Sequence, residues 1–446
     1  MATKRAAKPT GLTIRTYNVG FGDCFLLMFR YGKRAKHVLI DFGSTAAAKP
    51  SLSMDKIAQH IAGTTDALDA IIVTHRHADH ISGFTPRKGG KGSGDIIRRL
   101  AKNAVIVQPW TEDPKVKPTA KAPPKRGGGS AKSLAMDQVR SMEAMHDVAR
   151  IIARRAGSID VSGFDTDDES TADAALGISE SKVTKLRFLG EKNLKNVEAI
   201  RNLMTMSSPR KHRYVSFGVK SGLEEVLPGV QIDVLGPPTV AQSADVLKER
   251  RTDQAEFWML AARATNLTTS ANKKLFPDER SVTSADAPCA ERWFIDKVKR
   301  IHSEQLFELV RIVDDALNNT SVILLFTIGK TRLLFPGDAQ IENWEYALKL
   351  AKNKSQILTK LAGVNVYKVG HHGSRNATPK TLWKQFKKGK ALRTFLSTKS
   401  GKFPGRGNSG TEVPRKSLLT ELQKRSTLTN TQDESDICVD KDIPLR

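Results

Sequence analysis

Three histidines and one aspartate stand within six positions of this chain. Residues 71–80 read Ile-Ile-Val-Thr-His-Arg-His-Ala-Asp-His, so an apolar run, expected to form a buried strand, ends at His75, His77, Asp79 and His80. Side chains at i and i+2 of an extended backbone point the same way, so the first two histidines can share one cation. A turn after these histidines can direct Asp79 and His80 at a second cation. The alternative is a histidine-rich surface loop, but half of the chain's ten histidines fall here and in one other short segment.

Two later segments present more donors where strand-like runs end. The run Thr331–Phe335 breaks at Pro336-Gly337 and presents Asp338, which suits a carboxylate that bridges two cations. The run Val364–Val369 breaks at Gly370 and presents His371 and His372. Adjacent side chains at the end of a strand point apart, so one histidine of this pair is expected to coordinate a cation while the other faces substrate.

Several segments, taken in order, resemble the metallo-β-lactamase superfamily, whose hallmark is His-x-His-x-Asp-His. Besides residues 75–80 they are Asn18-Val-Gly-Phe-Gly-Asp-Cys24, Val38-Leu-Ile-Asp-Phe-Gly43, Asn319-Thr-Ser321, Leu333-Leu-Phe-Pro-Gly-Asp338 and Val366-Tyr-Lys-Val-Gly-His-His-Gly-Ser374. This set is similar to the metallo-β-lactamase domain of ComEC-type DNA-internalisation competence proteins. The resemblance covers roughly residues 12–110 and 210–425 and leaves the region between unexplained.

The resemblance implies an α/β fold, an αββα sandwich of two mixed β-sheets flanked by helices. It predicts one domain over residues 12–425, interrupted by a basic linker and helical insertion at 111–210 and a helical insertion at 239–318, and followed by a C-terminal tail at 426–446. Apolar runs predict strands, and 3.6-residue spacing predicts helices. The strands are expected at Leu12–Tyr17, Cys24–Phe29, His37–Asp41, Ala70–Thr74, Ala104–Gln108, Tyr214–Val219, Val230–Leu235 and Thr394–Ser397, and the helices at Ser133–Arg155, Ala241–Ala264, Glu291–Leu317 and Lys416–Gln423.

The resemblance also implies roles for the donors. Asp338 is the expected bridging ligand, and His371 is expected to complete a second metal with Asp79 and His80, which leaves His372 to contact substrate or protonate the leaving group. Asp41 matches a position that orients a metal-binding histidine, although an aspartate in a strand-end turn is the alternative. Lys368, Ser374 and Arg375 flank His371 in the sequence and are expected, with Asn319, to contact substrate, although Lys368 on a strand can equally face solvent.

Many members of the superfamily place one more histidine on the first metal. The candidates here are His146, His212 and His302, and none has a suitable sequence context, so the first metal is expected to be open or weakly held. Imidazole and carboxylate donors without thiolate predict two divalent cations, either Zn²⁺ or Mn²⁺. Such a pair, about 3.5–4 Å apart, lowers the pKa of a bound water and supplies hydroxide near neutral pH.

The charge of the chain points to an anionic partner. The 446 residues include 72 Lys and Arg against 47 Asp and Glu, a formal charge of +25. The basic residues gather at Lys115–Arg126 and at Lys384–Arg393, the latter close in sequence to the paired histidines. Such runs are often solvated surfaces, but beside a hydrolase site they favour nucleic acid, DNA or RNA, as the partner.

The remaining composition narrows the setting. The three cysteines have no paired spacing, which argues against disulfides and against a cysteine zinc site. No apolar run approaches the roughly 18 residues of a membrane span, and the first residues lack a signal-peptide core, so a cytoplasmic protein without a membrane span is expected. In ComEC-type proteins, DNA uptake depends on an accompanying membrane channel, so the resemblance does not predict DNA uptake for this chain.

These observations predict a metal-dependent hydrolase, foremost a phosphodiesterase or nuclease. One alternative is hydrolysis of a small-molecule ester, lactone, thioester or β-lactam, which the same kind of site performs in relatives. Another is a nucleic-acid-binding module with a structural metal. Asp79 and Asp338 argue against the last, because structural zinc prefers a closed site of four ligands.

Overall fold

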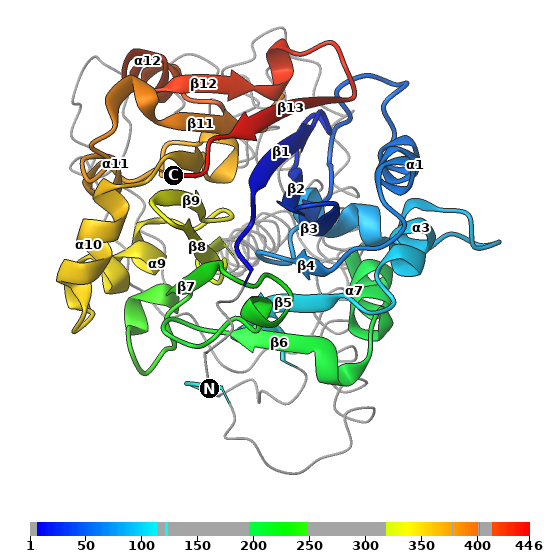
Figure 1. The fold of residues 1–446 in the computed structure, drawn as a ribbon, viewed down its shortest axis with the longest axis horizontal. Coiled ribbons are helices and arrows are strands. Elements are labelled where there is room, and N and C mark those ends of the chain that lie inside the picture. The colour runs from blue at the N-terminus through cyan, green and yellow to red at the C-terminus, as the bar shows by residue number, and fades with distance from the viewer. Residues whose placement is uncertain are drawn as a thin grey trace, which may run out of the picture.

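The computed structural model describes residues 7–113, 121–123, 196–247, 318–376, 378–399, 401 and 413–446. The expected helices Ser133–Arg155 and Glu291–Leu317, most of Ala241–Ala264 and most of the basic segment Lys115–Arg126 lie outside these residues. Within them, the chain forms two mixed β-sheets with helices on the two outer flanks (Figure 1). This is the αββα sandwich that was expected.

The first sheet has seven strands in the order β13-β1-β2-β3-β4-β5-β6. Neighbours pair antiparallel from β13 to β3 and parallel from β3 to β6. The strands are β1 (Gly11–Tyr17), β2 (Cys24–Tyr31), β3 (Arg34–Phe42), β4 (Ala70–Ile72), β5 (Val105–Pro109), β6 (His212–Val215) and β13 (Cys438–Ile443).

The second sheet has six strands in the order β12-β11-β10-β9-β8-β7. Its neighbours pair antiparallel from β7 to β9 and parallel from β9 to β12. The strands are β7 (Gln231–Gly236), β8 (Ile323–Ile328), β9 (Thr331–Phe335), β10 (Val366–Lys368), β11 (Arg393–Leu396) and β12 (Thr427–Asn430).

The helices divide between the two sheets. Those on the flank of the first sheet are α1 (Met54–Thr64), α2 (Ala78–Ile81), α3 (Ser93–Leu100) and α7 (Asn196–Thr205), and those on the flank of the second are α9 (Ile341–Glu345), α10 (Lys354–Ala362), α11 (Lys380–Trp383) and α12 (Lys416–Arg425) (Figure 1). None of the helices in the described part of the chain is long and apolar enough to cross a membrane.

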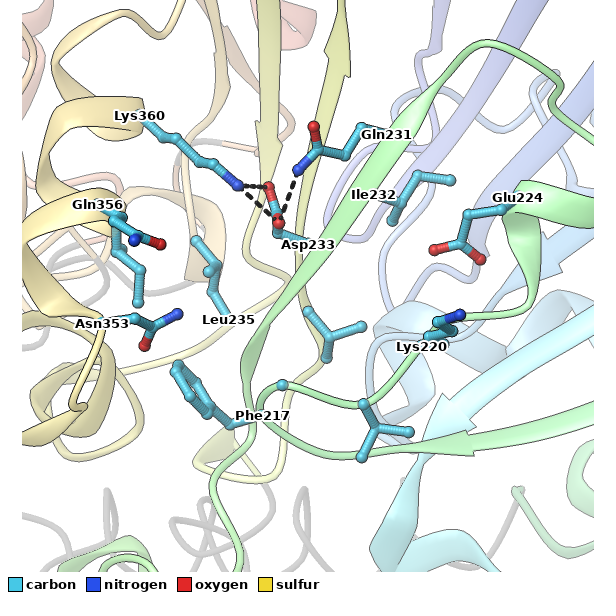
Figure 2. Close-up of a pocket in the computed structure, with 14 residues that line it drawn as sticks. Phe217, Lys220, Glu224, Gln231, Ile232, Asp233, Leu235, Asn353, Gln356 and Lys360 are labelled. Atoms are coloured by element: carbon cyan, nitrogen blue, oxygen red, sulfur yellow. Dashed lines mark hydrogen bonds and ion pairs between the residues drawn. The ribbon is translucent and has the colours of Figure 1, made fainter. Parts of the chain in front are cut away.

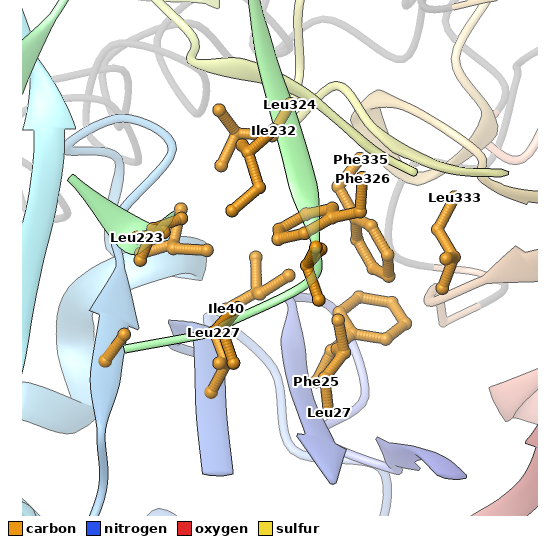
Figure 3. Packing of buried hydrophobic residues seen from close by; sticks show 14 of the residues in the cluster. Phe25, Leu27, Ile40, Leu223, Leu227, Ile232, Leu324, Phe326, Leu333 and Phe335 are labelled. Carbon is orange, nitrogen blue, oxygen red and sulfur yellow. The ribbon is translucent and has the colours of Figure 1, made fainter. Parts of the chain in front are cut away.

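The core between the sheets is built by alternation along the strands. On β2, Phe25, Leu27 and Phe29 face the second sheet, whereas Cys24 and Leu26 face the helices. Successive strand side chains point to opposite faces, and a strand that is buried on both faces reads as a continuous apolar run. Figure 3 shows the side chains of β2 and β3 packed against those of β7, β8 and β9. This packing fixes the separation of the two sheets.

Two expected domain boundaries are corrected. The segment 426–446 is not a tail, because β12 extends the second sheet beside β11 and β13 forms the outer strand of the first sheet beside β1. The end of the expected 111–210 insertion also belongs to the domain, since Ala199, Ile200 and Leu203 of α7 are buried against the first sheet.

We expect Phe326→Ala to lower the free energy of unfolding by about 3–5 kcal/mol, because the ring is fully buried between Phe29 and Phe335 and its removal leaves a cavity. Urea denaturation followed by circular dichroism measures the change. Val219→Ala, at a side chain that is 45% exposed, is the control and should change stability by less than about 0.5 kcal/mol. Equal effects of the two substitutions would contradict the packing described here.

Candidate metal centre

The donors predicted from the sequence lie at one edge of the sandwich. The carboxyl end of β3 carries Asp41, that of β4 leads to His75, that of β9 leads to Asp338, and that of β10 leads to His371 and His372. The first two strands belong to one sheet and the last two to the other. Both sheets therefore contribute to a single cluster of buried side chains.

Gly337 allows the two sheets to approach at this edge. Its φ is +56°, a conformation that favours glycine, and a Cβ built there would lie 2.6 Å from the Cβ of Thr74. The main chains are also bonded here, because the N–H of Val322 donates to the carbonyl of Thr74 at 2.9 Å. Asp338, the next residue, is thereby brought beside the histidines that follow β4.

His80 lies between two carboxylates. Its Nδ1 is 2.8 Å from Oδ2 of Asp41, and its Nε2 is 3.0 Å from Oδ2 of Asp338. Asp41 is itself held by Thr74, whose N–H and hydroxyl donate to its two oxygens at 2.8 and 2.7 Å. Burial lowers the pKa of His80, but Asp338 and Asp41 outweigh this and hold the pKa well above its usual range. Asp41 is placed to fix the ring so that Nε2 faces the other donors.

His75 and His77 continue the cluster on the side of β4. Nε2 of His75 lies 2.9 Å from Nδ1 of His77, and the His75 side chain is fully buried. Burial lowers the pKa of His75 well below its usual range, which favours the neutral imidazole that binds metals. The atoms that His75, His80 and Asp338 offer all lie within 4.8 Å of one another, a spacing that can hold a cation.

A second group of donors is formed by Asp79, His80 and His372, also within 4.8 Å of one another. Nε2 of His372 lies 3.2 Å from Oδ2 of Asp79 and 3.6 Å from Oδ2 of Asp338. Its Nδ1 lies 2.9 Å from the carbonyl oxygen of Ser397, which can only accept, so Nδ1 carries the proton of that bond. Nε2 is thus the atom directed at the carboxylates.

The expectation that His372 points away from the ligand atoms is corrected by this geometry. His371, expected as the ligand, donates its main-chain N–H to Oδ1 of Asp338 at 2.9 Å, and its side chain is in neither group of close donors in the described chain. The physical reason is the backbone. Both histidines have positive φ, 41° and 52°, so the chain turns after Gly370 and the alternation of a strand does not continue.

Lys368 and Asp23 form a buried pair beneath these donors. The Lys368 ammonium contacts Oδ2 of Asp23, and it lies 3.2 Å from Oδ1 of Asp338 and 3.1 Å from the carbonyl of Gly337. Burial lowers the pKa of this lysine, but the opposing effect of Asp23 and Asp338 is larger, so the pKa lies above its usual range. The expectation that Lys368 contacts substrate is therefore corrected, because its side chain is 3% exposed and already surrounded by oxygens.

Asp23 was not singled out from the sequence, although it lies in the segment Asn18–Cys24 that supported the resemblance. Its signal was a lone carboxylate directly before the apolar run of β2. The remaining expected substrate contacts differ in exposure: Asn319 and Ser374 are buried, and the Ser374 hydroxyl donates to Asn376 at 2.8 Å, whereas Arg375 is half-buried.

Other sequence candidates lie elsewhere. His212 begins β6, two strands away from β4, and its register through Ile106 places it level with Ile71, before the carboxyl edge where the donors follow β4. His146 and His302 lie outside the described residues. The basic tract Lys384–Arg393 precedes β11, while Ser397, just after β11, contacts His372, so the tract lies at the far end of that strand.

A separate cavity of about 330 Å³ lies beside β7 and α10 (Figure 2). Its lining includes Phe217, Asn353 and the ion pair between Lys360 and Asp233, in which the atoms are 2.7 Å apart. No residue of the donor cluster lines it. The cavity is therefore separate from the donor cluster.

Comparison with known families agrees with the geometry. Residues 17–86 match the family model described as the metallo-beta-lactamase superfamily, a stretch that contains Asp23, Asp41 and the donors at 75–80. None of the curated proteins compared matches the chain. The match supports assignment to this superfamily, and together with the buried donors it indicates a metal-dependent hydrolase.

The placement of the two neighbouring histidines can be tested by metal content. We expect His372→Ala to lower the bound metal of the purified protein by about one equivalent or its affinity by about 10-fold or more, because Nε2 joins Asp79 and Asp338. His371→Ala should retain most of the metal. Elemental analysis after dialysis measures both, and metal loss in His371→Ala alone would restore the roles expected from the sequence.

Proposed function

We propose that this chain is a phosphodiesterase that acts on nucleic acid and uses two divalent cations, either Zn²⁺ or Mn²⁺. The observation that carries the proposal is the position of Asp338, whose Oδ2 lies 3.0 Å from Nε2 of His80 and 3.6 Å from Nε2 of His372. This oxygen stands between the two groups of close donors and suits a ligand shared by two ions.

The charges in the cluster fit cations. Asp23, Asp41, Asp79 and Asp338 contribute four negative charges and Lys368 one positive charge, so the cluster carries a formal charge of −4 + 1 = −3 when its imidazoles are neutral. Unbalanced buried charge is costly, and divalent cations would offset it. The imidazole and carboxylate donors, without thiolate, fit Zn²⁺ or Mn²⁺. Bound there, such ions act as Lewis acids and lower the pKa of a water.

The protein's own groups have separate tasks in this proposal. Asp79 is the most exposed carboxylate of the cluster, with 16% of its side chain accessible, so it can accept a hydrogen bond from an incoming water. Asp41 orients His80, and the Ser397 carbonyl orients His372. Arg76, which stands between the two histidines after β4, pairs with Glu112 at 3.7 Å, and Arg375 follows His372 by three positions. In this proposal, these two guanidinium groups attract an anionic phosphate.

The distribution of basic residues favours a polymer over a single nucleotide. The tract Lys384–Arg393 is separated from the cluster by the length of β11, roughly 13 Å at about 3.3 Å per residue. A mononucleotide cannot contact both, whereas a polynucleotide can. The charge of +25 and the resemblance to ComEC-type domains support the same substrate class.

Metal dependence is the first test. We expect the purified protein to hold between one and two equivalents of transition metal, and Asp79→Ala and Asp338→Ala each to lose metal and hydrolysis while keeping the circular dichroism spectrum. Asp66→Ala, at an exposed carboxylate before β4, is the matched control and should retain both. A wild-type protein that holds no metal and takes up neither Mn²⁺ nor Zn²⁺ would refute the proposed centre.

Substrate class is the second test. A panel of labelled single- and double-stranded DNA and RNA should be cleaved in the presence of Mn²⁺ or Zn²⁺, and the affinity of the Asp79→Ala variant for oligonucleotides should fall steeply with salt, because neutralised phosphates release counterions. The panel also contains a lactone, a thioester and a β-lactam. Turnover of one of these, with an oligonucleotide affinity that does not respond to salt, would replace the proposal with small-molecule hydrolysis.

A further inference from the structure

Only oxygen atoms surround the ammonium of Lys368 in the contacts that the structure describes. They come from three places in the chain: the carboxylate of Asp23 before β2, the carbonyl of Gly337 at 3.1 Å, and Oδ1 of Asp338 at 3.2 Å. Carboxylate and carbonyl oxygens are the donors that hard divalent cations such as Mg²⁺ and Mn²⁺ prefer. The lysine thus stands where such a cation could be held.

The position is closed to solvent. The side chains of Lys368, Asp23 and Asp338 are at most 3% exposed. The small void beside them, lined on its polar side by Asp41 and Thr74, leaves no room for a water molecule. The charge of Asp23 is therefore balanced by the ammonium and not by solvent.

Asp338 is divided between this position and the donor cluster. Its Oδ1 accepts from Lys368 and from the main-chain N–H of His371 at 2.9 Å, while its Oδ2 faces His80 and His372. A carboxylate held through one oxygen in this way presents the other in a fixed direction. Lys368 is thus a positioning residue for the carboxylate that both groups of donors share.

We propose that the Lys368 ammonium is a built-in cation that fills an oxygen-lined cation site beside the metal centre, so that the centre takes two metal ions and not three. The inference rests on the proposed metal centre, and it is independent of which bond the protein hydrolyses. If Lys368 and Asp23 formed only a structural ion pair, removal of the lysine would destabilise the fold without creating a new binding site for a metal.

The test compares metal stoichiometry in Lys368→Ala and in the wild type by equilibrium dialysis against Mn²⁺ and elemental analysis. Truncation removes the ammonium and opens the space of its side chain, so Lys368→Ala should bind about one equivalent more than the wild type. Its melting temperature without metal should fall by roughly 5 °C or more, because Asp23 is left buried and unpaired, and Mn²⁺ should raise it more than in the wild type.

Three further variants separate charge from volume. Lys368→Met fills the same space without charge and should gain no equivalent. Asp23→Asn combined with Lys368→Ala removes a ligand and the unpaired charge together, so it should lose the extra equivalent and regain thermal stability. Lys360→Ala, which removes an ammonium paired with Asp233 beside the cavity of Figure 2, should leave the stoichiometry unchanged.

The outcomes keep the two proposals apart. An equal metal content of Lys368→Ala and wild type, with no greater stabilisation by Mn²⁺, would overturn the built-in cation and leave only a structural pair. A double variant that keeps the extra equivalent gained by Lys368→Ala would place the new ion away from Asp23 and also overturn it. A wild type without metal would refute the proposed metal centre, whereas a gain in Lys368→Ala over that baseline would still support the cation site.

Discussion

The close approach of the segments that follow β9 and β4 is the constraint on which the candidate site depends. Asp338 follows a strand of one sheet, and His80 lies in α2 after a strand of the other, and their side-chain atoms are 3.0 Å apart. Functional donors must be held within about 0.5 Å of a working geometry, and here the distance is set by two packed sheets. The aromatic packing of Phe25 against Phe335, with ring centroids 5.7 Å apart, supports the end of β9 directly below Asp338. The packing of the core therefore also sets the distances between the donors of the candidate site.

Most central strands could be predicted from the sequence, because strands buried on both faces leave continuous apolar runs. The strands β2, β8 and β9 are of this kind. The edge strand β13 lies in the last twenty residues, which are rich in Ser, Thr, Asp and Lys and were therefore expected to be a tail or an edge element. Edge strands often carry charge, and here Asp440 pairs with Arg15 of β1 at 2.7 Å. An ion pair between residues so far apart in the chain leaves no local pattern to detect.

The candidate site also contains some residues that local sequence identifies and others that only tertiary packing brings together. The donors at 75–80 were identified from spacing alone, since they follow one strand and need only local geometry. The choice between His371 and His372 depended on the backbone after Gly370, and the left-handed conformation of two consecutive non-glycine residues is not predictable from an alternation rule. The pair of Asp23 and Lys368 was missed because its members are joined only when the two sheets pack. Sequence spacing identifies donors on one segment, whereas tertiary packing decides what lies opposite them.

The chain combines a strongly positive total charge with a negative buried cluster. In the proposed function, the positive surface attracts the substrate before the substrate reaches the cluster. With neutral imidazoles, the form that binds metals, the cluster has a formal charge of −3 and repels a phosphodiester at short range in a poorly solvated place. The basic tract before β11 is exposed and lies at the far end of the strand, so it can attract a polyanion whether or not metal is bound. In the proposed function, binding of nucleic acid at the tract is thus separable from its binding at the metal centre, and only the second requires cations. The ammonium of Lys368 reduces the negative charge of the cluster by one, but it contacts Oδ1 of Asp338, on the side away from His372. In the proposed function, the negative charge that faces an incoming phosphate must therefore be neutralised by metal ions on the Oδ2 side of that carboxylate.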